Sequence, residues 1–204
     1  TVLSELGINI APLLAGAGVV GLAIGFGSQA LVKDVITGMF ILFEDTINVG
    51  DVVDLDGKSG SVEAITIRTI RLRDGQGSQL TIPFSAVTTI KNMTRDYGYY
   101  VFDLSVGYEN DVRRVEDILR KVDEEIRGDE AWKAKILSPI EIFGLDKFGD
   151  YAMRIGARVK TRPSQQWSVG REYNRRIKAA FDAGGIAIPY PTTISMTRGL
   201  PDGS

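Results

Sequence analysis

Residues Ile10 to Val32 read IAPLLAGAGVVGLAIGFGSQALV and contain no charged side chain. At about 1.5 Å per residue, a helix from Leu13 to Val32 is about 30 Å long, which is the thickness of the hydrocarbon core of a bilayer. Glycine and alanine fill much of this stretch, and each glycine costs a lone helix about 1 kcal/mol. Small residues three and four positions apart let membrane helices approach closely. The sequence therefore predicts a membrane helix that packs against copies of itself.

The same stretch contains a motif from a different class of protein. Residues Gly16 to Gly21 match G-x-G-x-x-G, and Glu44 follows at a spacing typical of a dinucleotide-binding site. That motif requires a strand before it and a helix with a polar face after it. Pro12 interrupts the strand, and the following turns stay apolar as far as Val32. We therefore rank a dinucleotide-binding enzyme below a membrane helix.

A signal peptide and a buried helix of a soluble protein are two other interpretations of this stretch. A secretory signal peptide begins with basic residues, but the one charged residue before this stretch is the acidic Glu5. A buried helix of a soluble protein stays open as an alternative, because length and apolar character alone do not exclude it.

The composition of the 204-residue chain narrows the classes of function. A net charge of −2 gives no general attraction to nucleic acid. The absence of cysteine and histidine excludes disulfides, thiol nucleophiles, Cys/His zinc sites and catalysis by imidazole. We expect a protein that is not an enzyme and uses no cofactor and no metal. Because the sequence opens on Thr1, we expect it to be part of a longer chain.

The apolar character continues beyond one charged pair. Lys33 and Asp34 end the uncharged run, and a second apolar run extends from Val35 to Phe43. Such a pair marks a point where a helix leaves the hydrocarbon or bends at its surface. Gly38 then provides a site at which a second, shorter helix can change direction.

Leu22 and Phe26 lie four positions apart, and therefore on one face of the predicted helix. If copies of the helix surround an axis, these side chains form two successive apolar rings. Narrow apolar rings close a pore by excluding water. The residues alone leave two roles open for this pair: such a gate, or contact with lipid and neighbouring helices.

Residues 47–98 change to a period of two, which is typical of strands. The segments are VGDVVDL, SVEAITI, RTIRLRD and SQLTIP, with turn signals at Asp56-Gly57 and Asp74-Gly75. Ile65 and Ile67 lie in one phase of the alternation, whereas Ile70 and Leu72 lie in the other. This slip predicts a bulge or bend in a strand that serves two sides of a small barrel.

One motif in this region imitates a calcium site. Asp54, Asp56, Gly57 and Glu63 fit four positions of an EF-hand loop. The first position of the loop is Val52, however, and the flanking segments are strands and not helices. We interpret the motif as a hairpin turn.

Residues 99–191 have the pattern of an α/β domain. A strand around Tyr100 to Tyr108 precedes a helix, two strands follow at about Ile140 to Leu145 and Tyr151 to Lys160, and a second helix runs from about Gln165 to Asp182. A last strand from Thr192 to Thr197 completes the β-α-β-β-α-β order of a ferredoxin-like unit. The first helix is capped by Asn110-Asp111, and its apolar stripe consists of Val112, Val115, Leu119, Val122 and Ile126. The second helix ends at Gly184-Gly185, and one of its sides carries Trp167, Gly170, Tyr173, Ile177 and Phe181.

Charged and aromatic residues give no sign of a nucleic acid partner. RNA-recognition modules share this strand and helix order, but they need exposed aromatics within a basic sheet motif, and the sequence shows no such motif. No nucleophile, general base or metal constellation is evident in this part. The charged groups that we interpret as solvated faces are Arg68, Arg71 and Arg73 on strands and Asp123, Glu124 and Glu125 on a helix.

Two segments resemble one family. The segment GLAIGFGSQALVKDVITGMFILFEDTINVGDVV, Gly21 to Val53, resembles the pore helix and following strand of the MscS family of small-conductance mechanosensitive channels. The segment FDAGGIAIPYP, Phe181 to Pro191, resembles the Phe-Asp-Ala-Gly-Ile and Pro-Tyr-Pro signature near the carboxyl end of that family. Pro83-Phe84 stands where the family has Pro-Asn. The resemblance extends from about Gly7 to Arg198.

The resemblance assigns roles along the first helix. In this family a helix rich in glycine and alanine lines the pore of a homoheptamer, and two leucines four residues apart form its constriction. These leucines correspond to Leu22 and Phe26. The positions for close helix packing correspond to Ala15, Gly18, Val19, Gly21, Ala23 and Gly25. The positions for bending correspond to Gln29, Ala30 and Gly38.

The resemblance also implies a chain of four parts. A pore-lining membrane helix with a bent extension (1–46) precedes a small all-β domain of the SH3-like barrel type (47–98). An α+β ferredoxin-like domain (99–191) follows and helps to form a hollow cytoplasmic cage. A terminal strand and tail (192–204) complete the chain, and Thr193 to Thr197 contribute to a β-barrel shared by all subunits.

By this resemblance, membrane tension opens the pore and releases ions and small osmolytes during hypoosmotic stress. We expect conduction by width, since no charged ring lies between Ile10 and Val32. We expect a homo-oligomer, with heptameric assembly, in contact with the lipids of a prokaryotic-type inner membrane, with the residues after about 46 in the cytoplasm and tension-sensing helices before Thr1. The competing interpretation is a membrane-anchored oligomeric scaffold that does not conduct.

Overall fold

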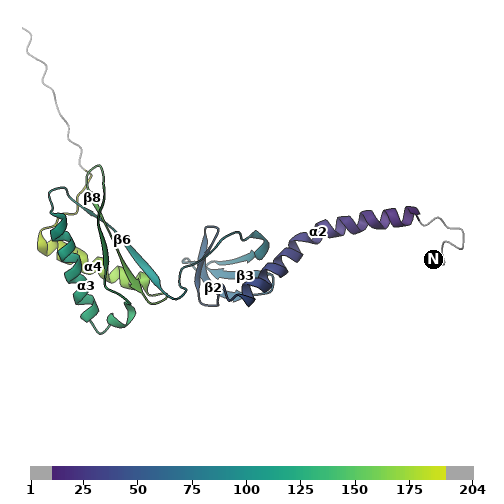
Figure 1. Cartoon of the computed structure of the whole chain (residues 1–204), viewed down its shortest axis with the longest axis horizontal. Coiled ribbons are helices and arrows are strands. Elements are labelled where there is room, and N and C mark those ends of the chain that lie inside the picture. The colour runs from purple at the N-terminus through teal and green to yellow at the C-terminus, as the bar shows by residue number, and fades with distance from the viewer. Residues whose placement is uncertain (1–10, 192–204) are drawn as a thin grey trace, which may run out of the picture. The chain divides into compact units, whose positions relative to one another are not determined.

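The computed structural model describes residues 11–191, and the contacts divide the chain into two compact units. The first unit ends at Thr94 and contains a long helix and a five-stranded sheet. The second unit begins at Arg95 and contains a three-stranded sheet and two helices. Figure 1 shows the elements of both units, which are described separately below.

The first unit begins with α2 (Ala11–Phe43), a single helix of 33 residues that contains both apolar runs. It passes through Lys33, Asp34 and Gly38 without interruption, so the second apolar run continues the same helix, and the predicted bend stays a prediction. The physical reason is that neither a charged pair nor one glycine removes a donor from the helical hydrogen-bond ladder. Within residues 11–191, α2 is the one helix long and apolar enough to cross a membrane.

The sheet of the first unit has the strand order β4-β3-β2-β1-β5, and all of the neighbouring strands in it pair antiparallel. A 3₁₀ turn, η1 (Phe84–Ala86), follows β4. The sequence did not predict β5, because three residues are too few to show an alternation. The strands are β1 (Val52–Leu55), β2 (Lys58–Ile65), β3 (Thr69–Arg73), β4 (Gln79–Pro83) and β5 (Ile90–Asn92).

The predicted Asp-Gly hairpin turn is confirmed between β1 and β2. Asp56 and Gly57 have φ angles of 50° and 86°, which is the left-handed pair that a two-residue hairpin loop requires. The carboxylate of Asp54 accepts a hydrogen bond from the backbone N–H of Gly57 at 2.9 Å. Asp54 and Asp56, which fit the calcium-binding motif, therefore form and stabilise this turn.

The predicted phase slip has two structural causes. A register shift lies between Val62 and Ala64, where β2 pairs with β3. Residues 66–68 then form the turn between these strands, closed by a 2.9 Å hydrogen bond from the backbone N–H of Thr69 to Oγ1 of Thr66. The slip between Ile67 and Ile70 is thus a turn between two strands, in addition to a bulge earlier in β2.

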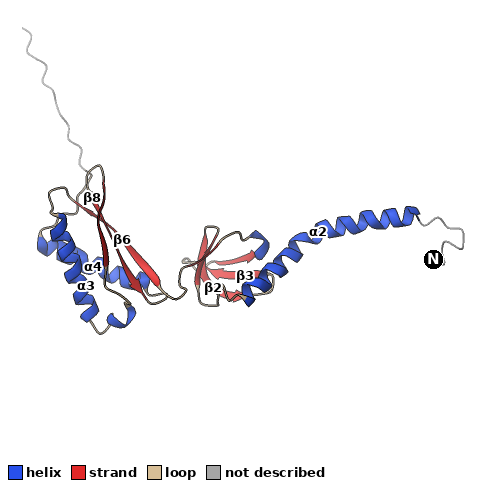
Figure 2. Cartoon of the chain, in the orientation of Figure 1, coloured by secondary structure: helices blue, strands red, loops and turns tan. Residues whose placement is uncertain are grey.

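The second unit has the strand order β6-β8-β7, with both pairs antiparallel. Figure 2 shows its strands in red and its helices in blue. The predicted last strand, at Thr192 to Thr197, lies outside the described residues. The ferredoxin-like assignment therefore stays a prediction. The elements are β6 (Gly98–Val106), α3 (Val112–Gly128), the 3₁₀ turn η2 (Lys133–Lys135), β7 (Glu141–Phe148), β8 (Met153–Thr161) and α4 (Gln166–Gly184).

The apolar stripes of α3 and α4 pack in the core of the second unit. Trp167 is exposed, so its predicted place on the buried face of α4 is wrong, and Gln166 and Val169 are buried there instead. A side chain at Gly170 would meet the ring of Tyr100 at 2.2 Å, which explains this glycine. Gly185 ends α4 with a φ of 68°.

A buried carboxylate joins the two helices of the second unit. Asp123 is 2% exposed and accepts hydrogen bonds from the Tyr173 hydroxyl (2.7 Å), the Ile140 N–H (3.1 Å) and Nε of Arg127 (2.8 Å). Its predicted place on a solvated helix face is therefore wrong. Burial, and next the hydrogen bond to Asp123, raise the pKa of Tyr173 well above its ordinary value.

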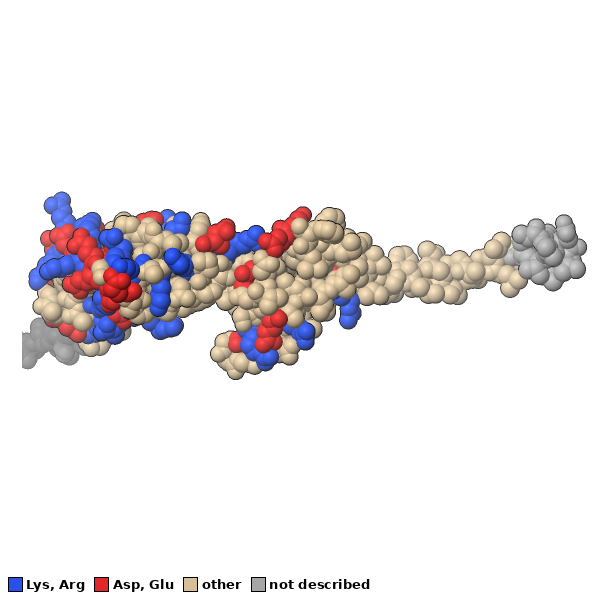
Figure 3. Space-filling model, turned by 90° about the horizontal axis from the view of Figure 1, so that it is seen from below, with Lys and Arg blue, Asp and Glu red and all other residues tan. Residues whose placement is uncertain are grey.

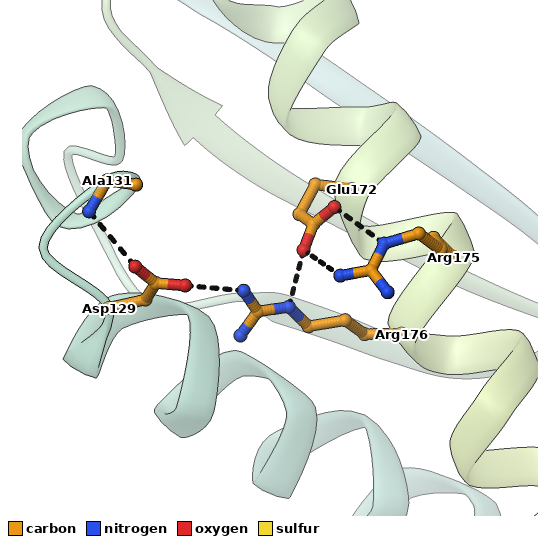
Figure 4. A network of polar contacts seen from close by, with 5 residues as sticks. All are labelled: Asp129, Ala131, Glu172, Arg175 and Arg176. Atoms are coloured by element: carbon orange, nitrogen blue, oxygen red, sulfur yellow. Dashed lines mark hydrogen bonds and ion pairs between the residues drawn. The ribbon is translucent and has the colours of Figure 1, made fainter.

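A second polar network links α4 to the end of α3 (Figure 4). Glu172 accepts hydrogen bonds from Arg175 (2.9 Å) and from Arg176 (2.6 Å). Arg176 also donates to Asp129 at 2.6 Å, and Asp129 accepts from the Ala131 N–H at 3.0 Å. The hydrogen bonds from Arg175 and then Arg176 lower the pKa of Glu172 to about 2, against the opposing effect of desolvation.

Candidate pore-lining helix

Residues 13–32 of α2, here called the exposed segment, contain no buried residue. Leu22 is 64% exposed and Phe26 is 75% exposed. A side chain added at Gly16, Gly18, Gly21, Gly25 or Gly27 would meet nothing within 4 Å outside the helix backbone. Figure 3 shows no charged atom along this part of the helix. A long apolar surface is therefore left for lipid or for other copies of the chain.

The uninterrupted helix fixes how the predicted site residues are arranged around its axis. At about 100° per residue, Leu22 and Phe26 lie about 40° apart and share a face. Gly21 and Ala23 lie about 100° to either side of Leu22. Gly18 and Gly25 lie on the flank of Gly21, whereas Val19 lies on the flank of Ala23, and Ala15 lies close to the shared face. Small side chains thus border the apolar pair on both sides.

Residues 33–43, here called the docked segment, pack on the rest of the first unit, chiefly on η1, through Asp34, Gly38 and Ile41. Asp34 is 3% exposed, and its Oδ1 accepts a hydrogen bond of 2.5 Å from the Ser85 N–H. The ammonium of Lys33 donates to the Ser85 carbonyl at 3.1 Å. The charged pair therefore holds η1 from two adjacent positions on the helix.

Gly38 lies where the helix closely approaches η1 and the turn between β2 and β3. A Cβ at this position would lie 2.1 Å from the carbonyl oxygen of Ile67 and 2.9 Å from the ring of Phe84. Only glycine fits this contact without a shift of backbone. Gln29 and Ala30, by contrast, are exposed. The structure thus separates the three residues predicted to bend the helix, since Gly38 is fixed by packing and the other two are not.

The contacts of Asp34, Phe84 and Ser85, which hold α2 on η1, are not predicted from the sequence. In the sequence, Asp34 marks only the end of an uncharged run, and Phe84 is only a difference from the Pro-Asn of the family. Phe84 is buried in the core of the first unit, beside Ile41 of α2. No local signal connects residues separated by 51 positions, such as Asp34 and Ser85, so only the fold brings them together.

The structure shows no residue group suited to metal chemistry within residues 11–191. No cluster of three or more histidine, cysteine, aspartate or glutamate residues is placed to hold a metal ion among these residues. The polar networks of this part, around Asp123 and Glu172, hold helices together in the second unit. The exposed segment of α2 is therefore the main candidate for function.

Sequence comparison matches three consecutive families of one kind of protein. The matches are "Mechanosensitive ion channel, transmembrane helices 2/3" over residues 1–29, "Mechanosensitive ion channel, beta-domain" over residues 30–95, and "Mechanosensitive ion channel MscS, C-terminal" over residues 100–188. A small-conductance mechanosensitive channel of Caldanaerobacter subterraneus is 35% identical over 95% of this chain and 67% of its own length. The chain belongs to the MscS family of mechanosensitive channels.

Other relatives agree with this membership of the MscS family. The moderate conductance mechanosensitive channel YbiO of Escherichia coli is 38% identical over 94% of this chain. The match covers 26% of the length of YbiO. The crystal structure of Helicobacter pylori MscS in its closed state superposes with a TM-score of 0.81 at 25% identity, over 97% of this chain and 78% of that one. Arabidopsis thaliana MSL1 shares the fold, with a TM-score of 0.68 at 15% identity.

Proposed function

We propose that this protein is the pore-forming subunit of a membrane channel that opens under tension and releases ions and small osmolytes. The observation that carries the proposal is the exposed segment of α2, with its uncharged surface and with Leu22 and Phe26 on one face. Family membership supports a mechanosensitive channel and a membrane location. We place the residues after about 46 in the cytoplasm.

The two flanks of the exposed segment support assembly into a closed ring. Ala23 lies on one flank, whereas Gly21 and Gly25 lie on the other. An alanine of one copy can therefore pack against the glycines of the next, and a contact between different flanks repeats around an axis until the ring closes. This arrangement turns Leu22 and Phe26 of every copy towards the axis. We propose seven copies by family resemblance.

In such a ring of helices, Leu22 and Phe26 shut the pore. Two successive apolar rings exclude water when they are narrow, and they admit water when the helices move apart. Tension favours the state that occupies more membrane area, because a ligand or force shifts an equilibrium through its different interaction with the two states. No charge lies among residues 13–32, so the passage selects by width.

The contacts of the docked segment indicate where the helix pivots. Residues 34–41 share buried contacts with η1 and the strands, so they move with the first unit. Bending at Gly38 would break the contacts with Ile67 and Phe84. We therefore propose that the pore helix bends before Lys33, around Gln29 and Ala30, in the region without neighbours in the chain.

The finer architecture is part of the same proposal. We assign residues 1–46 to the pore helix and its extension, 47–98 to an SH3-like β domain, 99–191 to a ferredoxin-like domain and 192–204 to an oligomeric barrel strand and tail. The β6-β8-β7 order supports the third assignment, because the corresponding strands of a ferredoxin-like unit have this order.

The test compares two serine variants on opposite sides of α2. Phe26→Ser should admit water at the narrow point, lower the tension at which the channel opens and raise the resting leak. Ile24→Ser is the matched control, because Ile24 is similarly exposed but lies about 160° from Leu22 on the helix. Pressure ramps on membrane patches measure both quantities. Unchanged threshold and leak in Phe26→Ser, with assembly intact, would remove Phe26 from the gate.

A further inference from the structure

One face of the second unit's sheet is not covered by α3 or α4. Residues of β8 alternate between buried and partly exposed along the whole strand. Arg154, Gly156, Arg158 and Lys160 point to the uncovered side, here called the open face. Their strand partners on β6 include Ser105 opposite Arg154 and Tyr99 opposite Lys160. The open face therefore carries a row of three cations along its central strand.

Aromatic rings lie beside two of these cations. The guanidinium carbon of Arg158 lies 4.3 Å from the ring centre of Tyr99 and 5.4 Å from that of Phe143. The ammonium of Lys160 lies 3.8 Å from the ring centre of Tyr97. Phe143 is 57% exposed. The open face thus presents planar rings and positive charges within a few ångströms of one another.

The charges of the open face leave one cation without an acidic partner. Glu141 pairs with Arg158 at 2.7 Å, and Asp103 pairs with Arg154. In the described part of the chain, Lys160 has no carboxylate partner. A hollow of about 390 Å³ adjoins Arg154 at the β7–β8 turn and is also lined by Ser105, Lys147 and Phe148. That hollow lies at the opposite end of β8 from Lys160, so the positive charge available to an anion beside the rings is the ammonium of Lys160.

Gly156 keeps the open face flat. A Cβ at this position would lie 3.2 Å from the ring of Phe143, so the missing side chain lets that ring lie across the central strand. A flat face with rings and cations fits a ligand that is itself planar at one end and anionic at the other. The base of a nucleotide stacks on aromatic rings, and its phosphates pair with arginine and lysine.

We propose that the open face binds a nucleoside di- or triphosphate, with the base against the exposed ring of Phe143 and the phosphates at Lys160. Single-stranded RNA fits less well, because the carboxylates of Asp103, Glu141 and Asp146 lie among the cations of the open face and leave little net charge for a long phosphate backbone. Sequence reasoning excluded nucleic acid modules because no single strand shows a basic aromatic motif. The fold assembles these residues from the loop before β6, from β6 itself, from β7 and from β8.

The experiment measures ATP binding to the assembled full-length protein in lipid nanodiscs by calorimetry. Lys160→Gln should weaken ATP binding about tenfold, the usual effect of losing one charge-assisted contact. Lys121→Gln is the matched control and should leave the affinity unchanged, because Lys121 lies on α3 and away from the open face. Phe143→Leu keeps an apolar side chain but removes the ring, and it should weaken ATP binding while sparing pyrophosphate.

Each outcome decides the proposal. Absence of ATP binding up to millimolar concentration overturns it, as would happen if another copy covered the open face. Equal affinity for pyrophosphate and ATP overturns the role of the rings, and equal affinity for adenosine and ATP overturns the role of the cations. If the protein binds a single-stranded oligonucleotide but does not bind ATP, the open face is a nucleic acid site instead. The result is independent of the proposed gate, since every variant here lies outside α2.

Discussion

The two segments of α2 belong to one uninterrupted helix but meet opposite surroundings. The exposed segment, residues 13–32, has no buried residue, whereas the docked segment buries Asp34, Gly38 and Ile41 against the first unit. Both segments contain glycine, but for different reasons. Glycines of the exposed segment have open space around them, and Gly38 has a carbonyl oxygen where its side chain would be.

This difference shows that the position of a small residue does not reveal its role. In the exposed segment small residues can serve only contacts that another molecule supplies. In the docked segment the glycine serves a contact already made within the chain. Substitutions that add bulk should therefore affect assembly in one segment and folding of the first unit in the other.

The largest effect is expected from Gly21→Leu. The added side chain lies on the flank that faces a neighbouring copy, so it should prevent close packing and either disrupt the oligomer or raise the tension threshold. Leu13→Trp is the control, because Leu13 is exposed and lies about 180° from Leu22, so the added bulk points away from both flanks and should leave the oligomer intact. Native mass spectrometry and patch recording measure these results. Normal assembly and gating of Gly21→Leu would contradict close packing.

Gly38→Ala should destabilise the first unit by about 1–3 kcal/mol, because overpacking a filled contact forces backbone and ring to shift. The new Cβ would lie 2.1 Å from the Ile67 carbonyl oxygen. Gly27→Ala is the control and should cost nothing in this unit. Hydrogen exchange of β3 and η1 measures the change. Equal protection of these segments in both variants would show that the docked segment is loosely held.

Asp34→Ala should cost about 1–2 kcal/mol, since it leaves the N–H of Ser85 without its acceptor. Asp34→Asn retains an acceptor oxygen and should recover much of the loss. The readout is the exchange rate of the Ser85 amide, which should rise in the alanine variant. Unchanged exchange in that variant would mean that the carboxylate does not hold η1.

The smallest effect is expected outside α2, at Glu172, and it tests whether the two units respond separately. Its pKa is lowered from 4.5 to about 2, so its stabilisation is complete above about pH 4.5 and is lost as the pH falls towards 2. Glu172→Gln should remove a pH dependence on the order of 1 kcal/mol across that window.

The chain's two tryptophans make this measurement specific. Trp132 and Trp167 both lie in the second unit, so their fluorescence reports its unfolding alone. Hydrogen exchange of Ser85 in the first unit should be the same in Glu172→Gln and in the unchanged protein. Identical acid sensitivity of the fluorescence in the two proteins would show that the pairing with Arg175 and Arg176 contributes nothing.

Features with a local cause could be predicted from sequence, and features with a distant cause could not. Asp56-Gly57 is a turn because of its own backbone preferences, and the stripe from Val115 to Ile126 forms a helix face because of its spacing. Asp123 was misplaced because its partners, Tyr173 and Ile140, are far along the chain.

The candidate site divides in the same way. Leu22 and Phe26 share a face in any continuous helix, so their pairing was predictable. The roles of Asp34 and Gly38 depend on Ser85, Ile67 and Phe84, which only the folded first unit places beside them.

The most direct test of the central claim is a pressure ramp on membrane patches that contain the purified full-length protein alone. The account predicts stepwise currents that appear with suction, because tension separates the rings of Leu22 and Phe26. Silence from an oligomer shown to be assembled would contradict a pore opened by tension, and it would leave α2 as the membrane anchor of a scaffold.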